Sequence, residues 1–101
     1  MNIPSKVKVA GYDYLVERPP STFLDGAQAV DGLHNAGSQC IKVARIGTDD
    51  YQNTVFLHEL LHAIIYAFTP DEQDEKFVEQ VSKGLYQVIK DNPEIFSDSK
   101  E

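Results

Sequence analysis

The sequence predicts an α+β fold in which a small, mainly antiparallel sheet precedes two packed helices. Apolar residues alternate with period two in the first half of the chain and recur at helical spacing in the second half. The length of 101 residues suits a single domain that spans residues 1–101. A chain this short buries only about two-thirds of the surface that its unfolded form exposes, so we expect a thin stability margin.

Composition and charge exclude several classes of protein. Hydrophobic residues make up 42% and charged residues 25%, which excludes a disordered or collagen-like chain. The net charge of -7 repels phosphate backbones, so we expect no nucleic-acid partner. The single cysteine, Cys40, excludes an internal disulfide and fits a reducing compartment. Since no apolar run has the length of a membrane span or signal core, we expect a cytoplasmic protein without membrane contact.

The first half of the chain contains the predicted strands. Residues 7–16 alternate around Gly11 and predict a β-hairpin, which Pro19 and Pro20 end. Residues 21–37 are rich in glycine, aspartate and asparagine, which predicts mostly loop with room for a short strand over residues 32–35. Residues 40–46 alternate again and predict a second strand, in which Cys40 is a small buried side chain.

The pattern changes to helical at Asp49, which we expect to be an N-cap with Gln52 as its partner. Apolar residues follow at helical spacing and predict a central, buried helix. These residues are Leu57, Leu60, Leu61, Ala63, Ile64, Ala67 and Phe68.

A second helix is predicted to begin after the first. Thr69 is its expected N-cap, Pro70 its first helical residue, and Glu72 completes the capping box. We expect this helix to end before the pair Asn92-Pro93. The residues expected to face inward are Val78, Val81, Leu85 and either Val88 or Ile89, with Ile95 and Phe96 packing back as a short tail.

The chemically informative segment is His58-Glu59-Leu60-Leu61-His62, an HExxH motif on the first predicted helix. Two histidines four residues apart lie one turn apart on the same face, so their imidazoles can bind one Zn²⁺. Glu59 lies about 100° around the helix from His58 and can act as a general base without being a ligand. Zinc would polarise a carbonyl group and lower the pKa of water toward neutrality.

The motif has a simpler explanation, in which His58 and His62 are ordinary core or surface histidines. A shuffled chain of this composition would contain the pattern in roughly one case per hundred or fewer. Both histidines also neighbour leucines, where an imidazole without a partner is costly to bury. We therefore favour the metal-binding interpretation.

A catalytic zinc needs a third protein ligand and an open fourth position. Glu79 is the preferred candidate because it lies mid-helix beside the apolar stripe, where a carboxylate needs a specific reason. Glu75 lies one turn earlier on the same face and is the second choice, although an acid near a helix N-terminus also has an ordinary explanation. The remaining alternatives are His34 or no third ligand.

Three further residues have both a possible functional role and a simpler structural one. His34 is expected to be an exposed loop histidine. Tyr51 and Tyr66 flank the motif and could donate hydrogen bonds to an oxyanion. We expect them instead to pack in the core or at the rim of a cleft.

The stretches HELLHAI (residues 58–64), EKFVE (residues 75–79) and GLYQVIKDNP (residues 84–93) resemble a family of small bacteriophage and prophage proteins. These are minimal gluzincin-like metallopeptidases related to the ImmA/IrrE-like peptidases. The resemblance is strongest over residues 53–93, weaker over residues 6–16 and absent over residues 19–39. It implies zinc held by His58 and His62, Glu59 as general base, and Glu79 as third ligand.

These expectations lead to a functional hypothesis of zinc-dependent hydrolysis of a peptide or protein substrate in the cytoplasm of a bacterial host. The substrate would lie in a cleft between the motif helix and a sheet edge, where it can add as an extra strand. One alternative is a non-enzymatic phage accessory protein that keeps zinc as a structural element. Another is a degenerate peptidase that acts as a protein-binding module. Glu59 favours catalysis, because a purely structural site has no use for an acid at that position.

Overall fold

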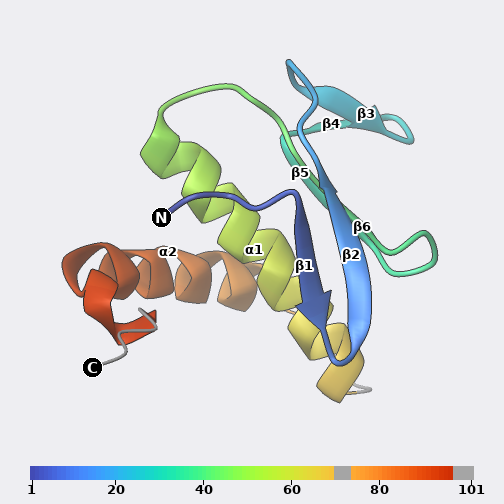
Figure 1. Ribbon diagram of the computed structural model, residues 1–101. Helices are drawn as coiled ribbons and strands as arrows, with labels where there is room; N and C mark the ends of the chain where they lie inside the picture. The colour runs from blue at the N-terminus through green and yellow to red at the C-terminus, as the bar shows by residue number, and fades with distance from the viewer. Residues whose placement is uncertain (70–73, 97–101) are drawn as a thin grey trace.

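The structure is a computed structural model and describes residues 1–69 and 74–96. Strands fill the first half of the chain and helices the second half, as Figure 1 shows. The strands are β1 (Lys6–Val9), β2 (Tyr12–Glu17), β3 (Phe23–Asp25), β4 (Gln28–Val30), β5 (Gly32–Asn35) and β6 (Cys40–Val43). The helices are α1 (Asp49–Phe68), α2 (Glu75–Asp91) and the short 3-10 helix η1 (Pro93–Phe96).

Four strands form one sheet in the order β1-β2-β6-β5. The β1–β2 and β5–β6 pairs are antiparallel, and the β2–β6 pair is parallel. Strands β3 and β4 form a separate antiparallel hairpin beyond one end of this sheet (Figure 1). The sequence-based prediction of an α+β fold with a mainly antiparallel sheet is therefore confirmed, and β5 is an edge strand of the sheet.

The predicted β1–β2 hairpin is confirmed and turns tightly at Ala10 and Gly11. Both residues have positive φ, 53° and 85°, as a two-residue turn between twisted strands requires. Val9 and Tyr12 are paired across this turn. The buried side chains of the hairpin are Val9, Tyr14 and Val16.

The prediction that residues 21–37 form mostly loop is only partly correct. Strand β5 forms where the sequence left room for it, but the β3–β4 hairpin was not predicted. Each of its strands has only three residues, which is too short for an alternating pattern to be recognised. The next strand, β6, ends at Val43 and is shorter than the predicted 40–46 segment, while Cys40 is buried as expected.

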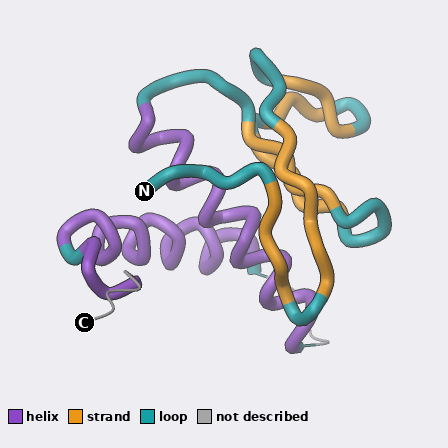
Figure 2. The backbone as a smooth tube through the Cα atoms, in the orientation of Figure 1, coloured by secondary structure: helices purple, strands orange, loops and turns teal. Residues whose placement is uncertain are grey.

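Helix α1 lies against the sheet, and α2 crosses α1 and packs against it (Figure 2). Helix α1 packs against β5 and β6 and contributes Phe56, Leu57 and Ala63 to the core. Its predicted apolar stripe does not stay buried, since Ile64 and Phe68 are exposed in the last turns. The apolar stripe therefore extends beyond the part of α1 that the sheet covers.

The helix starts differ from the predicted ones. Thr48, one residue before Asp49, is the N-cap of α1, and its hydroxyl accepts a hydrogen bond from the Tyr51 N–H at 3.0 Å. Thr69 ends α1 instead of beginning α2. The predicted helix-starting residues Pro70 and Glu72 lie outside the described residues. The N-cap of α2 is Asp74, whose carboxylate accepts hydrogen bonds from the backbone N–H groups of the first helical turn.

Helix α2 is rotated relative to the prediction. Its buried residues are Val78, Ser82 and Tyr86, whereas Val81 and Val88 are exposed. Leu85 and Ile89 pack partly against the core, as expected. Tyr86, which was not expected to face inward, is buried with its hydroxyl bonded to α1. The expected packing of the tail is wrong, since Ile95 and Phe96 are exposed.

A hydrogen-bond network holds α2 against the first turns of α1. The Tyr86 hydroxyl donates to the Asp50 carboxylate at 2.6 Å and accepts from the Asn53 amide at 3.2 Å. Lys90 donates to the other oxygen of Asp50 at 2.9 Å. This network joins the second half of α2 to the first turns of the helix that carries the HExxH motif. Among the described residues, none of the helices has the length and apolar character of a membrane span.

Candidate metal centre

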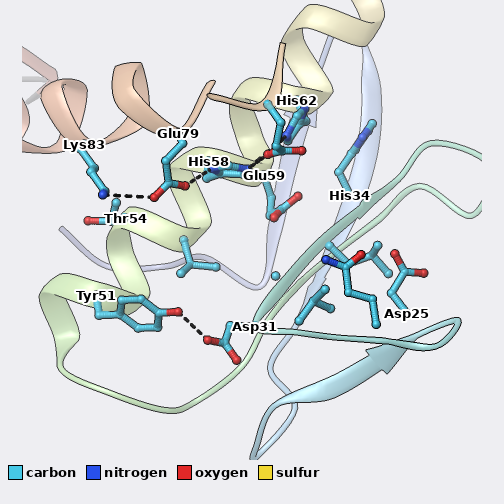
Figure 3. A pocket seen from close by; sticks show the side chains of 16 residues that line it. Asp25, Asp31, His34, Tyr51, Thr54, His58, Glu59, His62, Glu79 and Lys83 are labelled. Carbon is cyan, nitrogen blue, oxygen red and sulfur yellow. Dashed lines mark hydrogen bonds and ion pairs between the residues drawn. The ribbon is translucent and has the colours of Figure 1, made fainter. Parts of the chain in front are cut away.

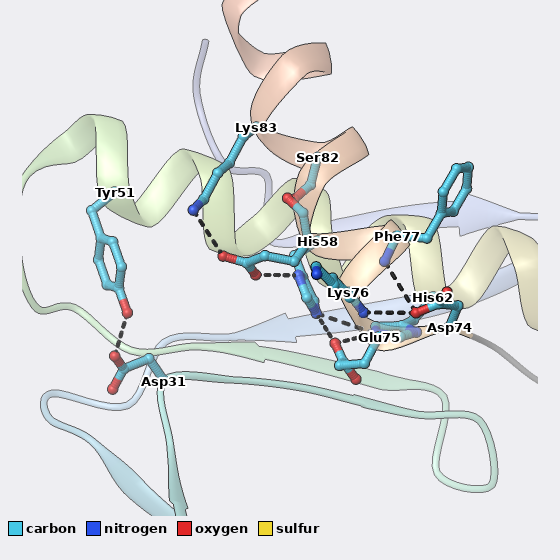
Figure 4. Close-up of polar contacts among 11 residues, drawn as sticks. Asp31, Tyr51, His58, His62, Asp74, Glu75, Lys76, Phe77, Ser82 and Lys83 are labelled. Atoms are coloured by element: carbon cyan, nitrogen blue, oxygen red, sulfur yellow. Dashed lines mark hydrogen bonds and ion pairs between the residues drawn. The ribbon is translucent and has the colours of Figure 1, made fainter.

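The first turns of α2 cross α1 at the HExxH motif. His58 and His62 lie one turn apart on α1, and their side chains are largely buried, with exposed fractions of 14% and 13%. Glu75 and Glu79 lie one turn apart on α2 and face these imidazoles. Figure 4 shows Glu75 directly beside the two rings. The four side chains are thus brought together by the crossing of two helices.

Three ligand-type atoms from these residues converge. The Nε2 atoms of His58 and His62 are 3.2 Å apart. Oε1 of Glu75 lies 2.5 Å from Nε2 of His58 and 3.1 Å from Nε2 of His62. This is the only group of three or more potential metal ligands that meets a 4.8 Å spacing among residues 1–69 and 74–96.

The group contains Glu75 in the place for which Glu79 was expected. Glu75 was the second choice because its position near the helix start offered an ordinary explanation for an acid. In the structure its pKa is lowered: burial would raise it, but hydrogen bonds and charge from His62 and His58 outweigh that effect. The sequence could not decide between two acids on one face, since both contact His58 and only the packing of α2 on α1 determines which one lies beside both Nε2 atoms.

Glu79 contacts the opposite side of the same imidazole. Its Oε1 lies 3.1 Å from Nδ1 of His58, and its Oε2 lies 3.2 Å from Nζ of Lys83 (Figure 3). A carboxylate on Nδ1 fixes the tautomer of a histidine and directs Nε2 outward, which is the usual support for a metal-binding histidine. Glu79 is therefore placed to orient His58.

The residues present fit a zinc ion. Two imidazoles and one carboxylate form a donor set that zinc accepts in catalytic sites, with a fourth position left open. Ligand atoms around a tetrahedral zinc would be about 3.3 Å apart, since zinc–ligand bonds are about 2.0–2.1 Å. The separations of 3.1 and 3.2 Å that involve Nε2 of His62 are close to this value, and the separation of 2.5 Å between Oε1 of Glu75 and Nε2 of His58 is shorter. The Glu75 side chain is 72% exposed, so the group opens to solvent on that side.

Glu59 points into the core side of the same cleft, as Figure 3 shows. It is only 9% exposed and lies against Gly32 of the edge strand. Burial raises its pKa to about 7, and nearby Glu75 and Asp25 add to the effect while His62 opposes it. A buried carboxyl group with this pKa can both accept and release a proton near neutrality.

The cleft has a volume of about 800 Å³ and is bounded by α1, the start of α2, β5 and the β3–β4 hairpin. Tyr51 lies on its rim, as expected, and donates a hydrogen bond from its hydroxyl to Asp31 at 2.5 Å. The hydrogen bond to Asp31 raises the pKa of Tyr51 to about 12. Hydrogen bonds from Thr22 and Tyr51 lower the pKa of Asp31. This pair connects α1 to the segment between β4 and β5.

The prediction that His34 is an exposed loop histidine is wrong. It belongs to strand β5, is only partly exposed and lines the cleft. The centroid of its ring lies 5.4 Å from that of Tyr14 and 5.9 Å from that of Tyr66, and both ring pairs are tilted. Tyr66 itself is mostly exposed and contacts His34 only with its ring.

Sequence reasoning missed two residues that shape the site. Tyr14 was assigned to a strand without a role, although the period-two pattern already placed it on the same face as Val16. Gly32 was assigned to a loop or to the start of a short strand, without a role at the site. No local pattern distinguishes a turn glycine from one that allows a strand and a helix to approach closely.

No protein-family model, curated protein or solved structure matches the chain. The functional conclusion therefore depends on the side-chain geometry at the crossing of α1 and α2.

Proposed function

We propose that the protein is a zinc-dependent hydrolase that cleaves peptide bonds. One observation carries this proposal. The Nε2 atoms of His58 and His62 and Oε1 of Glu75 lie within 3.2 Å of one another, with the buried Glu59 adjacent to His58 in the same cleft. The resemblance of the motif segments to small phage metallopeptidases supports the same activity.

His58, His62 and Glu75 would hold the ion, and Glu79 would orient His58 through Nδ1. When bound, zinc supplies a Lewis acid that polarises the carbonyl group and makes water acidic enough to attack near neutral pH. The exposed side of Glu75 leaves the open position that a catalytic site requires. A purely structural zinc site is normally closed by four protein ligands, so this openness favours catalysis.

Glu59 is the general base of the proposed reaction. As the water oxygen bonds to the carbonyl carbon, one water proton passes to the Glu59 carboxylate. Glu59 then transfers that proton to the amine nitrogen while the C–N bond breaks. A divalent cation beside Glu59 favours its charged form, which opposes the effect of burial on its pKa.

The edge of the sheet supplies a place for an extended substrate. Strand β5 pairs with β6 on one side only, and its residues Gly32, Leu33 and His34 line the cleft. An extended peptide can add to such an edge through backbone hydrogen bonds. The substrate class that we propose is therefore a peptide or an extended protein segment.

The decisive experiment compares wild type with Glu59→Gln in the zinc-loaded state, using a library of fluorescence-quenched peptides. A general base contributes about 10²–10⁴-fold, so we expect Glu59→Gln to lose at least 100-fold in kcat/KM while it keeps its zinc. Glu94→Gln is the matched control, because Glu94 is an exposed acid of η1 outside the cleft. Zinc binding without cleavage of any peptide by wild type would favour the structural accessory role instead.

A further inference from the structure

We propose that His34 is a substrate-contacting residue of this centre and donates a hydrogen bond to the carbonyl oxygen as that oxygen becomes negatively charged. This inference rests on the proposed function, since it assigns a second stabilising group to the same reaction. The donor is the Nδ1–H group of the His34 ring.

The location of His34 is suited to this role. Its side chain rises from the edge strand β5 into the part of the cleft that holds His62 and Glu59, as Figure 3 shows. It is near enough to His62 for the two to interact electrostatically. It is nevertheless outside the group of atoms that can share one ion. A group at this position reaches a substrate bound at the metal and leaves the ion to its own ligands.

Tyr14 fixes which ring nitrogen of His34 carries the proton. The Tyr14 hydroxyl lies 3.1 Å from Nε2 of His34, and within the described part of the chain this hydroxyl makes no other hydrogen bond. Because a buried hydroxyl proton needs an acceptor, and Nε2 of His34 is the only one within reach of Tyr14 among the described residues, we assign the Tyr14 hydroxyl as the donor and Nε2 as the acceptor. A neutral imidazole has one N–H group, so the proton of His34 is then on Nδ1. Nδ1 has no recorded hydrogen-bond partner among residues 1–69 and 74–96, and it is therefore available to a ligand.

The surroundings keep this donor neutral and fixed in orientation. Burial, with a smaller contribution from His62, lowers the pKa of His34, so the imidazole carries no charge near neutral pH. Burial also raises the pKa of Tyr14, which is only 5% exposed, so its hydroxyl stays protonated. A neutral N–H group can lie near a divalent cation without the repulsion that an imidazolium would experience. The contacts with the rings of Tyr14 and Tyr66 restrict rotation of the imidazole.

A purely structural role does not explain this arrangement. A histidine kept only for packing between two tyrosines would have no need of a bonded Nε2 and a free Nδ1 on a cleft wall. Preorganised donors of this kind are typical of sites that stabilise developing negative charge.

The test uses cobalt-loaded protein and inorganic phosphate as a tetrahedral oxyanion, with binding followed by the visible absorption of Co²⁺. We expect His34→Ala to bind Co²⁺ as tightly as wild type but to bind phosphate about tenfold or more weakly, because it lacks a hydrogen bond to a charged group. His34→Gln, which keeps a side-chain N–H donor, should recover part of that affinity. Tyr14→Phe should weaken phosphate binding by a smaller factor, since it frees the tautomer but keeps the ring.

Tyr66→Phe is the matched control, because it keeps the ring against His34 and removes only a hydroxyl group. Unchanged phosphate affinity in His34→Ala would overturn the proposal, as would failure of the cobalt-loaded wild type to bind phosphate. A loss of affinity in Tyr66→Phe that equals the loss in His34→Ala would also overturn it. A loss of Co²⁺ binding in His34→Ala would instead make His34 a ligand. Failure of wild type to bind any metal would contradict the proposed function itself, before His34 is tested.

Discussion

Gly32 on the edge strand and Glu59 on the motif helix are in such close contact that a larger residue at position 32 requires neighbouring side chains to shift. A Cβ atom on Gly32 would lie 2.7 Å from Oε2 of Glu59 and 2.6 Å from Cγ1 of Val55. The missing side chain allows β5 to approach α1 and to cover the Glu59 carboxyl group. The burial of Glu59, and hence its raised pKa, depends on this contact.

Gly32→Ala is therefore expected to push β5 and α1 apart and to expose Glu59. Overpacking of this kind costs about 1–3 kcal/mol of the free energy of unfolding. We also expect the pKa of Glu59 to fall from about 7 toward its ordinary value of 4.5, because water would reach the carboxyl group. Carbon-detected NMR titration of Glu59 and urea unfolding measure the two effects.

Gly84→Ala is the matched control for this substitution. Gly84 lies in α2, and a Cβ atom there would meet no atom within 4 Å. Alanine favours a helix over glycine by about 1 kcal/mol, so this variant should be at least as stable as wild type. A Gly32→Ala protein with unchanged stability and unchanged Glu59 pKa would contradict the close contact.

Glu59→Gln is expected to stabilise the metal-free protein at alkaline pH. The pKa of Glu59 is raised on folding, so the folded state holds a proton that the unfolded state has lost between about pH 4.5 and 7. The stability of wild type therefore decreases as pH rises through this window, by at most about 3 kcal/mol for this shift. Glutamine cannot ionise and avoids that loss.

The measurement is urea unfolding of wild type and Glu59→Gln at pH 4.5 and pH 8 with a chelator present. We expect the variant to gain stability over wild type only at pH 8. The same difference at both pH values would show that ionisation of Glu59 is not its cause. Glu94→Gln, at an exposed position, should show no such gain at either pH.

Tyr51→Phe removes one of the two hydroxyl groups that bond to Asp31. The pKa of Asp31 is depressed in the folded protein, so its contribution to stability is present above its unfolded pKa and is lost as pH falls through the folded value. We expect the variant to raise the pKa of Asp31 and to lose about 1 kcal/mol at pH 7. NMR titration of the Asp31 carboxyl group measures the shift, and an unchanged pKa would rule out the Tyr51 hydrogen bond. Tyr12→Phe, which alters an exposed strand tyrosine, is the control.

Tyr86→Phe should loosen the start of α2 from the motif helix. The Tyr86 hydroxyl bonds to both Asp50 and Asn53, so its loss leaves Asn53, which is buried, without this partner. A cost of about 1–3 kcal/mol is expected for such a group. We also expect the network to position α2 on α1, so zinc affinity should decrease although Tyr86 is not a ligand. A stability loss without any change in zinc affinity would mean that the network does not position Glu75.

Much of the fold follows from local patterns in the sequence. The turn at Gly11, the two long helices and the HExxH face are encoded within a few residues each, and the structure contains all of them. The three-residue strands β3 and β4 are too short for such a pattern. The burial of Tyr86 was not predictable from a local pattern, because its hydroxyl bonds to Asp50, which is more than thirty residues away in the sequence.

The candidate site also contains residues that the sequence could identify and residues that it could not. His58, Glu59 and His62 are fixed by spacing along one helix, so the sequence alone could identify them. The choice between Glu75 and Glu79, by contrast, depends on the angle between two helices. The location of His34 depends on the pairing of β5 with β6, which is a contact between separate segments.

The most direct test of the metal centre is the zinc content and zinc affinity of Glu75→Ala and Glu79→Ala beside wild type. We expect one zinc per wild-type chain, loss of zinc from Glu75→Ala, and a 10–100-fold lower affinity in Glu79→Ala, because Glu79 only orients His58. Full zinc binding by Glu75→Ala, together with its loss from Glu79→Ala, would contradict the group of His58, His62 and Glu75 as the metal ligands.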